Sequence, residues 1–228
     1  MIYFDNAASS FPKPTNVVYN VNKWIRQNGA NPGRSGHKPS LDAAQQVFDT
    51  RVAIARMFGV NDCENIAFVP NATYGLNILL QGLLEQDDHV VTTVFEHNSV
   101  LRPLFYMQKI KNVSIDVCDV DLYDDDTTVD NIIKKIKSNT KLVVCTQCSN
   151  VCGKEMPIEA IAKRLPKNIK LVVDGSQGAG IIPINLEKSG VDYYCAPSHK
   201  GLLGIQGSGF IAINSYLPKP IFSGGTGS

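Results

Sequence analysis

Lys200 is the residue whose chemistry most needs an explanation. It follows an apolar, aromatic run at residues 193–196 that is typical of a buried strand, comes directly after Pro197, Ser198 and His199, and precedes three spaced glycines. Burial lowers the pKa of a lysine because it disfavours the charged form, and the neutral amine can attack a carbonyl group to form a Schiff base. The alternative is a solvated lysine in an exposed turn, which is the commoner state of this residue type.

Asp174 supplies a second group that favours the reactive lysine. The β-branched run at residues 171–173 predicts a short strand that ends in Asp174, with small polar residues after it. Ligands of open α/β sheets bind beyond the carboxyl ends of the strands. An aspartate there, about a strand and a helix before Lys200, suits pyridoxal phosphate (PLP), because the carboxylate keeps the pyridine nitrogen protonated while the lysine holds the aldehyde. Together the two residues predict a PLP site.

Three other predicted strand ends carry polar residues that suit the same cofactor. Ala72 and Thr73 stand at a helix start, where free N–H groups and the helix dipole favour a phosphate; a simple N-cap role for Thr73 is the alternative. His97 either stacks on an aromatic cofactor or caps a helix. The amide of Asn150 can donate to a phenolate oxygen or to a substrate carboxylate.

Alternating strands and helices from residue 65 onward predict an α/β fold with a largely parallel sheet covered on both faces. The expected strands are 66–69, 90–94, 113–118, 142–146, 171–174, 193–196 and 209–213, and the expected helices between them are 74–84, 99–111, 129–137 and 158–164. Before them we expect a helix from about residue 17 to near Gly29, and an amphipathic helix at 40–58 with Ser40 as its N-cap, Asp42 in its first turn and Gly59 at its end. Residues 1–60 would then form a helical arm and a wrapping helix, and residues 61–228 a PLP-binding large domain.

The composition excludes several classes of protein. A chain of 228 residues with 43% hydrophobic residues, 19% charged residues and a net charge of +1 predicts an ordinary globular protein without a nucleic-acid surface. The apolar runs are strand-sized, and the N-terminus lacks the features of a signal peptide, so we expect no membrane association and a cytoplasmic location. The six cysteines lie mostly in apolar strands, as small buried side chains do in a reducing compartment.

Two patterns resemble metal sites. Cys145, Cys148 and Cys152 have a suggestive spacing, but alternation along a strand predicts that Cys145 and Cys148 point apart, and no fourth ligand accompanies them. The acidic run at 119–126 lacks the glycine and the distal glutamate of a calcium loop, so a solvated connection is expected. We therefore expect no metal site.

The motifs, taken together, resemble those of the class V aminotransferases of fold type I, and within them the cysteine desulfurases related to NifS and SufS. The matching segments are YFDNAA (3–8), NPGR (31–34), NAT (71–73), EHN (96–98), SNVCG (149–153), DGSQ (174–177), HKG (199–201) and GGTG (224–227). They occur in the family's order along the whole chain. The resemblance implies the large domain of that fold, with a mostly parallel seven-stranded sheet in three αβα layers.

The resemblance also implies roles for individual residues. Lys200 would carry the Schiff base and move protons at the substrate α-carbon, Asp174 would pair with the pyridinium, and His97 would stack on the ring. Gln177 would hydrogen-bond the phenolate oxygen, with Asn150 close to that oxygen and to the substrate. The phosphate would be held by Ala72, Thr73 and His199, with Ser198 compensating for Pro197, which stands where many relatives have a phosphate-binding serine.

The implied reaction is the removal of sulfur from L-cysteine to give L-alanine and an enzyme persulfide. Relatives continue beyond the position of Ser228 into a smaller C-terminal domain, which supplies the persulfide cysteine and the arginine that binds the substrate carboxylate. We therefore expect a truncated or split chain that binds the cofactor weakly by itself. Homodimerisation and a sulfur-acceptor protein are the partners that the resemblance implies.

Two alternatives remain open at this point. Another class V activity, such as selenocysteine lyase or an aminotransferase for small amino acids, would use the same half of the enzyme. A non-catalytic fragment that binds PLP or serves in dimerisation is the other, although a scaffold has no need of Lys200, Asp174, His97 and Gln177 together.

Overall fold

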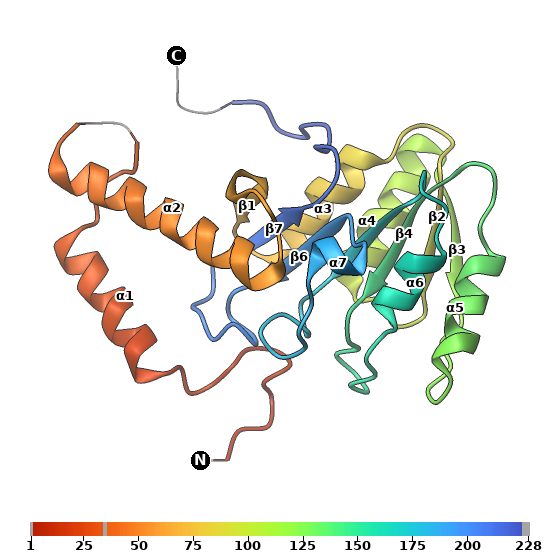
Figure 1. The fold of residues 1–228 in the computed structure, drawn as a ribbon, viewed down its shortest axis with the longest axis horizontal. Helices are drawn as coiled ribbons and strands as arrows, with labels where there is room; N and C mark the ends of the chain where they lie inside the picture. Colours follow the sequence, from red (N-terminus) through yellow and green to blue (C-terminus); the bar gives the residue numbers. More distant parts are fainter. Residues whose placement is uncertain (1, 34–35, 225–228) are drawn as a thin grey trace.

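The computed structural model describes residues 2–33 and 36–224, and within them it contains a sheet of seven strands and the helices around it (Figure 1). The strands are β1 (Ile66–Val69), β2 (His89–Thr93), β3 (Ser114–Cys118), β4 (Thr140–Thr146), β5 (Lys170–Asp174), β6 (Tyr193–Pro197) and β7 (Gly209–Ile213). The α-helices are α1 (Thr15–Gln27), α2 (Lys38–Phe58), α3 (Ala72–Leu83), α4 (Asn98–Lys111), α5 (Asp125–Lys134), α6 (Ile158–Arg164) and α7 (Leu186–Ser189). Arg34 and residues 225–227, which belong to two of the motifs above, lie outside the described residues.

The sheet confirms the predicted α/β class. Its strand order is β1-β7-β6-β5-β4-β2-β3, and β7 pairs antiparallel with both β1 and β6, while the remaining neighbours are parallel. Each of the seven strands expected from the sequence is present, with ends shifted by at most a few residues. The strands could be predicted because strands buried on both faces are apolar along their whole length. Segments with a helical pattern separate these apolar runs in the sequence.

Two hydrophobic clusters, one on each face of the sheet, make the three layers. Alternation along the strands sends Val90, Val144 and Val172 to one face, where they pack with residues of α3 and α4. Their neighbours Val91, Val143 and Val173 face the other way and pack with the end of α2 and with α5, α6 and α7. The predicted covering of both faces by helices is confirmed.

Strand register brings the chemically important residues to one edge. Thr146 at the end of β4 lies opposite Asp174 at the end of β5, and Asp174 lies opposite Cys195 in β6. β6 ends two residues later, and the connection that carries Lys200 begins there, closed at its base by the pairing of Pro197 with Gly209. The carboxyl ends of adjacent parallel strands therefore form the floor on which a ligand can sit.

The two N-terminal helices differ from their predicted description. α2 begins at Lys38, with the ring of His37 accepting a hydrogen bond from the Ser40 backbone N–H at 3.3 Å, so His37 is the N-cap and Ser40 lies inside the helix. Asp42 is correspondingly outside the first turn, while Gly59 ends the helix in a left-handed conformation as expected. The cap was mispredicted because serine is the commoner capping residue.

Helix α2 contacts the body of the protein mainly through its last turns. Phe58 packs its ring 5.1 Å from that of Tyr194 and 5.0 Å from that of Phe210. α1 contains no buried residue, and in Figure 1 α1 and the first turns of α2 extend away from the sheet. An arm is therefore the better description of both helices, and the domain boundary near residue 60 stays a prediction.

The acidic run at 119–126 belongs to a helix start. Asp124 caps α5 by accepting hydrogen bonds from the backbone N–H groups of Asp126 and Thr127, and Asp125 and Asp126 occupy the first turn. Negative side chains are favourable there because of the helix dipole. α5 therefore begins four residues before the predicted start, at Asp125 instead of Val129.

No helix in residues 2–33 or 36–224 is both long enough and apolar enough to cross a lipid bilayer.

We predict that Gly175→Ala destabilises the fold. A Cβ at this position would lie 2.0 Å from Cζ of Tyr194, a fully buried ring. Overpacking of this kind costs about 1–3 kcal/mol, which urea unfolding measures as a lower free energy of unfolding. Gly36→Ala is the matched control, because no atom of the described residues lies within 4 Å of its added Cβ. Equal stabilities for the two variants would contradict the described packing around Tyr194.

Candidate functional site

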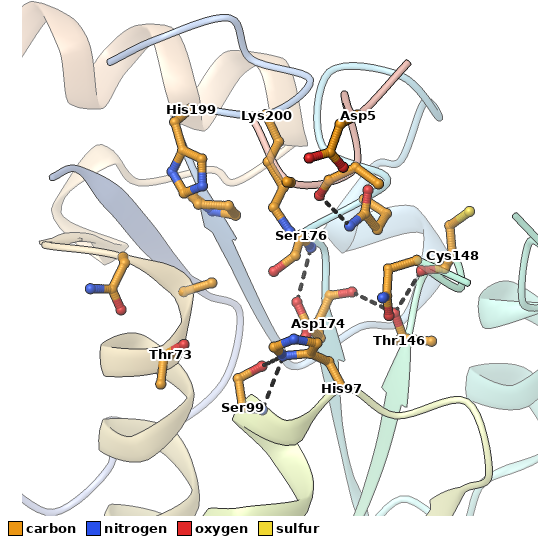
Figure 2. Close-up of a pocket in the computed structure, with 17 residues that line it drawn as sticks. Asp5, Thr73, His97, Ser99, Thr146, Cys148, Asp174, Ser176, His199 and Lys200 are labelled. Atoms are coloured by element: carbon orange, nitrogen blue, oxygen red, sulfur yellow. Dashed lines mark hydrogen bonds between the residues drawn. The ribbon is translucent and has the colours of Figure 1, made fainter. Parts of the chain in front are cut away.

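A polar pocket of about 470 Å³ lies at the carboxyl edge of the parallel strands. Figure 2 shows four side chains around it that come from the ends of three strands: His97 after β2, Asp174 at the end of β5, and His199 and Lys200 after β6. It brings together eight of the residues that the sequence suggested, namely Ala72, Thr73, His97, Asn150, Asp174, Gln177, His199 and Lys200. The roles given to them remain predictions, but the residues do share one cavity.

Lys200 lies in the connection between β6 and β7, and its side chain points down toward Asp174 and Ser176 (Figure 2). The turn is tight, because the Leu203 N–H donates to the Lys200 carbonyl at 2.8 Å and a Cβ on Gly201 would lie 2.4 Å from the Ala179 carbonyl oxygen. Burial lowers the pKa of Lys200, and the nearby charge of Asp174 raises it, with burial the larger effect. The structure thus favours a more readily deprotonated amine than a surface lysine has.

Asp174 ends β5 and is 1% exposed. Its Oδ1 atom accepts a hydrogen bond from the Ser176 backbone N–H at 2.9 Å, which directs the carboxylate into the pocket (Figure 2). A buried carboxylate is costly unless charged or hydrogen-bonding partners compensate for the lost hydration. The Ser176 N–H is one such partner, the charge of Asp174 acts on Lys200 across the pocket, and a cationic ring nitrogen would be a further partner.

The structure confirms the capping role of His97, and its stacking on a cofactor ring stays a prediction. It is the N-cap of α4, and its Nδ1 atom accepts from the Ser99 N–H at 3.1 Å and lies 2.8 Å from the Ser99 hydroxyl. Because Nδ1 accepts, the proton of the neutral ring is on Nε2. In Figure 2 the ring nevertheless lies inside the pocket beside Asp174, so capping fixes the ring without removing it from the site.

The N-terminus of α3 forms another wall of the pocket. Asn71 is its N-cap, with Oδ1 accepting from the Tyr74 N–H at 2.8 Å, so the alternative role of Thr73 as the cap is wrong. Ala72 and Thr73 are left in the first turn, where backbone N–H groups lack partners within the helix. Such a terminus favours an anionic group.

His199 adds a second polar group to the pocket. Its Nδ1 atom is buried and has no hydrogen-bond partner among the described residues. Burial lowers the pKa of His199, as do the neighbouring charges of Lys200 and Lys13. A buried nitrogen without a hydrogen bond lowers the stability of the folded protein. The Nδ1 atom of His199 therefore indicates that a ligand or water completes the hydrogen bonding there.

Ser198 does not line this pocket. Its hydroxyl donates to the Ile205 carbonyl at 2.7 Å and contacts Ser208 Oγ at 2.5 Å, and both partners belong to the turn that Lys200 begins. The expectation that Ser198 replaces a phosphate-binding serine therefore finds no support in this geometry. Its hydroxyl is used to hold the turn closed, and Pro197 faces the pocket with no donor.

Cys145 and Cys148 point to different surroundings, as the alternation of side chains along a strand predicted, and Cys152 lies apart from both. Cys145 is buried in the core, Cys148 lines the pocket and Cys152 is exposed on the following turn. In the part of the chain that the structure describes, no group of three histidine, cysteine or acidic residues is arranged to hold a metal ion.

Sequence reasoning missed several residues of the pocket. Asp5, Ala7 and Ala8 form a wall from the far end of the chain, and Gln177 donates from Nε2 to the Ala7 carbonyl at 3.0 Å. The motif at 3–8 signalled this segment, but no pattern told which body residue it would meet. The other lining residues without an assigned role are Asn71, Ser99, Thr146, Cys148, Ser176 and Pro197.

Glu96 is a further missed residue, buried beneath the site. Its Oε1 atom accepts from the Thr93 hydroxyl at 2.7 Å and from the Thr146 N–H at 3.0 Å, while Oε2 has no partner among the described residues. Burial raises its pKa to about 8. The side chain ties β2 to β4 just before His97 and is neutral over most of the acidic and neutral range.

We predict that Glu96 makes the stability of the protein fall as pH rises toward 8. The folded-state pKa lies above that of the unfolded chain, so the folded state holds a proton that the unfolded state has lost between those two values. The stabilisation is complete below the unfolded value and is lost as pH rises through about 8. Across this window the loss amounts to a few kcal/mol. Urea unfolding of Glu96→Gln should show a flatter pH dependence than wild type.

Glu159→Gln is the matched control for this measurement, because Glu159 is exposed on α6. It should keep the wild-type slope. A Glu96→Gln variant with an unchanged slope would mean that Glu96 is ionised in the folded protein.

Comparison with known proteins places this geometry in a family. Residues 2–227 match the family model described as Aminotransferase class-V. The chain is 31% identical over 229 residues to a probable cysteine desulfurase of Borreliella burgdorferi, covering 98% of this chain and 54% of that protein. It is also 31% identical over 237 residues to a probable cysteine desulfurase of Pyrococcus abyssi, covering 99% and 57%.

A solved structure agrees with the sequence matches. The apo cysteine desulfurase of Thermococcus onnurineus is similar with a TM-score of 0.87 and 28% identity, over 98% of this chain and 57% of that one. The chain thus spans about half the length of the curated relatives it matches. The resemblance expected from the motifs is confirmed: this chain belongs to the class-V aminotransferase family.

Proposed function

We propose that the chain is the cofactor-binding part of a PLP-dependent enzyme. PLP carries an aldehyde, a pyridine nitrogen and a phosphate, and the pocket offers a suitable group for each: the Lys200 amine, the Asp174 carboxylate, and the α3 N-terminus with His199. The buried Nδ1 of His199 has no hydrogen-bond partner within the described part of the chain, which fits a site that a polar ligand completes. The observation that carries the proposal is the Lys200 amine directed at buried Asp174 within one polar pocket (Figure 2).

Each residue of the pocket has a part in this proposal. When bound, PLP supplies an electron sink that stabilises negative charge at the substrate α-carbon. Lys200 would hold the aldehyde and move a proton at that carbon, and Asp174 would keep the ring nitrogen protonated. His97 would lie flat on the ring. Gln177 and Asn150 would donate to the phenolate oxygen, while Ala72, Thr73 and His199 would hold the phosphate.

The reaction that we propose for the whole protein is removal of sulfur from L-cysteine, giving L-alanine and an enzyme persulfide. Its support is the pair of relatives at 31% identity, both named probable cysteine desulfurases. The class V alternatives, selenocysteine lyase or an aminotransferase for small amino acids, would use the same PLP pocket. A non-catalytic PLP-binding or dimerisation fragment is the remaining alternative, and a Lys200→Ala variant that kept its biological activity would favour it.

The partners and the location are also part of the proposal. We infer a homodimer, supported by α1, whose residues are all at least partly exposed in the single chain although the helix is amphipathic. A sulfur-acceptor protein follows from the proposed persulfide. A cytoplasmic location is supported by Cys118, Cys145 and Cys195, which are free thiols buried in the apolar core.

The cofactor is tested by a spectrum. We predict that the purified chain with added PLP acquires a visible absorption band, and that borohydride reduction fixes the cofactor covalently on Lys200, because a reduced Schiff base no longer hydrolyses. Peptide mass spectrometry measures the added mass. Lys200→Ala should lose the label, whereas Lys163→Ala, which changes an exposed lysine of α6, should keep it. A label on other lysines in wild type would remove Lys200 from its proposed role.

The substrate is tested separately on the PLP-loaded protein. We expect L-cysteine to yield equal amounts of alanine and of sulfide in the presence of a reductant. We expect Lys200→Ala to lower this rate by about 10²-fold or more, as loss of a group that transfers a proton at the reacting centre does. Amino transfer that depends on an added keto acid would instead favour the aminotransferase alternative.

A further inference from the structure

The N-terminal segment, residues 3–13, is bound to the body of the protein at the peptide that precedes Lys200. Four hydrogen bonds converge on the carbonyl oxygen of His199: from Lys13 Nζ at 2.8 Å, Ser10 N at 3.0 Å, Ser10 Oγ at 3.0 Å and Ser9 Oγ at 3.3 Å. A carbonyl oxygen has two lone pairs, so these donors exceed what it can bond at full strength. The short, charge-assisted contact from Lys13 is the strongest of them.

Lys13 directs its charge to this carbonyl. Its ammonium group also donates to Ser10 Oγ at 2.6 Å, and among the described residues it forms no ion pair with an acidic side chain. Burial lowers its pKa. The Lys13 side chain is only partly buried, so the two short contacts to the His199 carbonyl and to Ser10 Oγ are the observations that tie it to this place.

The segment that Lys13 anchors forms one wall of the pocket. Asp5, Ala7 and Ala8 line it together with Lys200, and Figure 2 labels Asp5 and Lys200 among the lining residues. A further hydrogen bond, from Gln177 Nε2 to the Ala7 carbonyl, closes this wall over the site. Without the segment, solvent would reach Lys200 from this side.

We propose that Lys13 is a positioning residue: through the His199 carbonyl it holds residues 3–13 on the Lys200 turn, and so keeps the Lys200 amine half-buried and directed toward Asp174. The inference rests on the proposed function of Lys200, but the contacts that support it all lie within this chain and involve no ligand. The rest of the turn has bonds of its own, from Leu203 N to the Lys200 carbonyl and from Gly204 N to the Ser198 carbonyl, so loss of Lys13 should release the segment without unfolding the turn.

The test measures the titration of Lys200 in the chain without PLP, by competitive labelling with acetic anhydride over a range of pH and peptide mass spectrometry. In wild type we expect the labelling midpoint of Lys200 to lie below that of Lys38, whose side chain is 86% exposed. In Lys13→Met, which keeps the length of the side chain but loses the donor, the Lys200 midpoint should rise by about one pH unit because its amine becomes solvated. Deuterium uptake at residues 3–13 should rise with it.

The variants separate positioning from other effects. Lys13→Arg keeps a cationic donor and should restore the wild-type midpoint, and Lys38→Met should leave it unchanged. The ionisable groups that share the pocket with Lys200, namely Asp5, His97, Cys148, Asp174 and His199, are intact in all three variants. If Lys13→Met fails to fold, Ser10→Ala removes the hydroxyl that contacts both Lys13 and His199, and it should raise the midpoint in the same direction.

An unchanged Lys200 midpoint in a folded Lys13→Met variant overturns the proposal, as does a rise that Lys13→Arg fails to reverse. The result does not depend on PLP. If wild type fails to bind PLP but Lys13→Met raises the Lys200 midpoint, the proposed function is contradicted and the positioning role holds. If wild type binds PLP but Lys13→Met leaves the Lys200 midpoint unchanged, the positioning role is contradicted and the proposed function holds.

Discussion

The placement of the half-buried Lys200 side chain and the buried Asp174 carboxylate in one pocket is the constraint on which the rest of the structure depends. Burial acts on Lys200 in one direction and the charge of Asp174 acts in the other, and burial is the larger effect. The amine must therefore be enclosed enough to lose its proton readily, while the carboxylate keeps partners that make its own burial tolerable. This balance requires rigid surroundings, because a small change in solvent access changes both the effect of burial on Lys200 and the effect of the Asp174 charge.

The sheet supplies that rigidity through its register. Asp174 is held between the parallel neighbours β4 and β6, with cores on both faces of the sheet, so its backbone cannot shift without disturbing both hydrophobic clusters. Lys200, in contrast, lies in a loop that joins two antiparallel strands, β6 and β7. That loop is closed at its base by strand pairing and across its width by Ser198, so a hydroxyl first assigned to a phosphate serves to shape the turn.

Polar groups around the pocket combine structural and chemical tasks in the same way. His97 caps α4 with one nitrogen and presents its ring to the pocket, and Asn71 caps α3 so that the following N–H groups face an incoming anion. Glu96 joins two strand ends beneath them as a neutral acid. The cap fixes the side chain at little entropic cost, because the helix has already ordered the backbone to which it bonds.

Local sequence was enough to predict the seven strands, the two-sided sheet and eight residues of the pocket, because strand period, buried apolar runs and polar strand ends are properties of neighbouring residues. Helix starts at His37 and Asp124 were less predictable, since several capping residues competed within a few positions. Tertiary structure alone decided which groups meet: that Lys13 and Ser10 bond the carbonyl before Lys200, that Glu96 is buried, and that the Ser198 hydroxyl bonds Ile205 across its own loop. These contacts join residues with no pattern in common, and only the packing of the folded chain sets the burial and the distances that give them their energies.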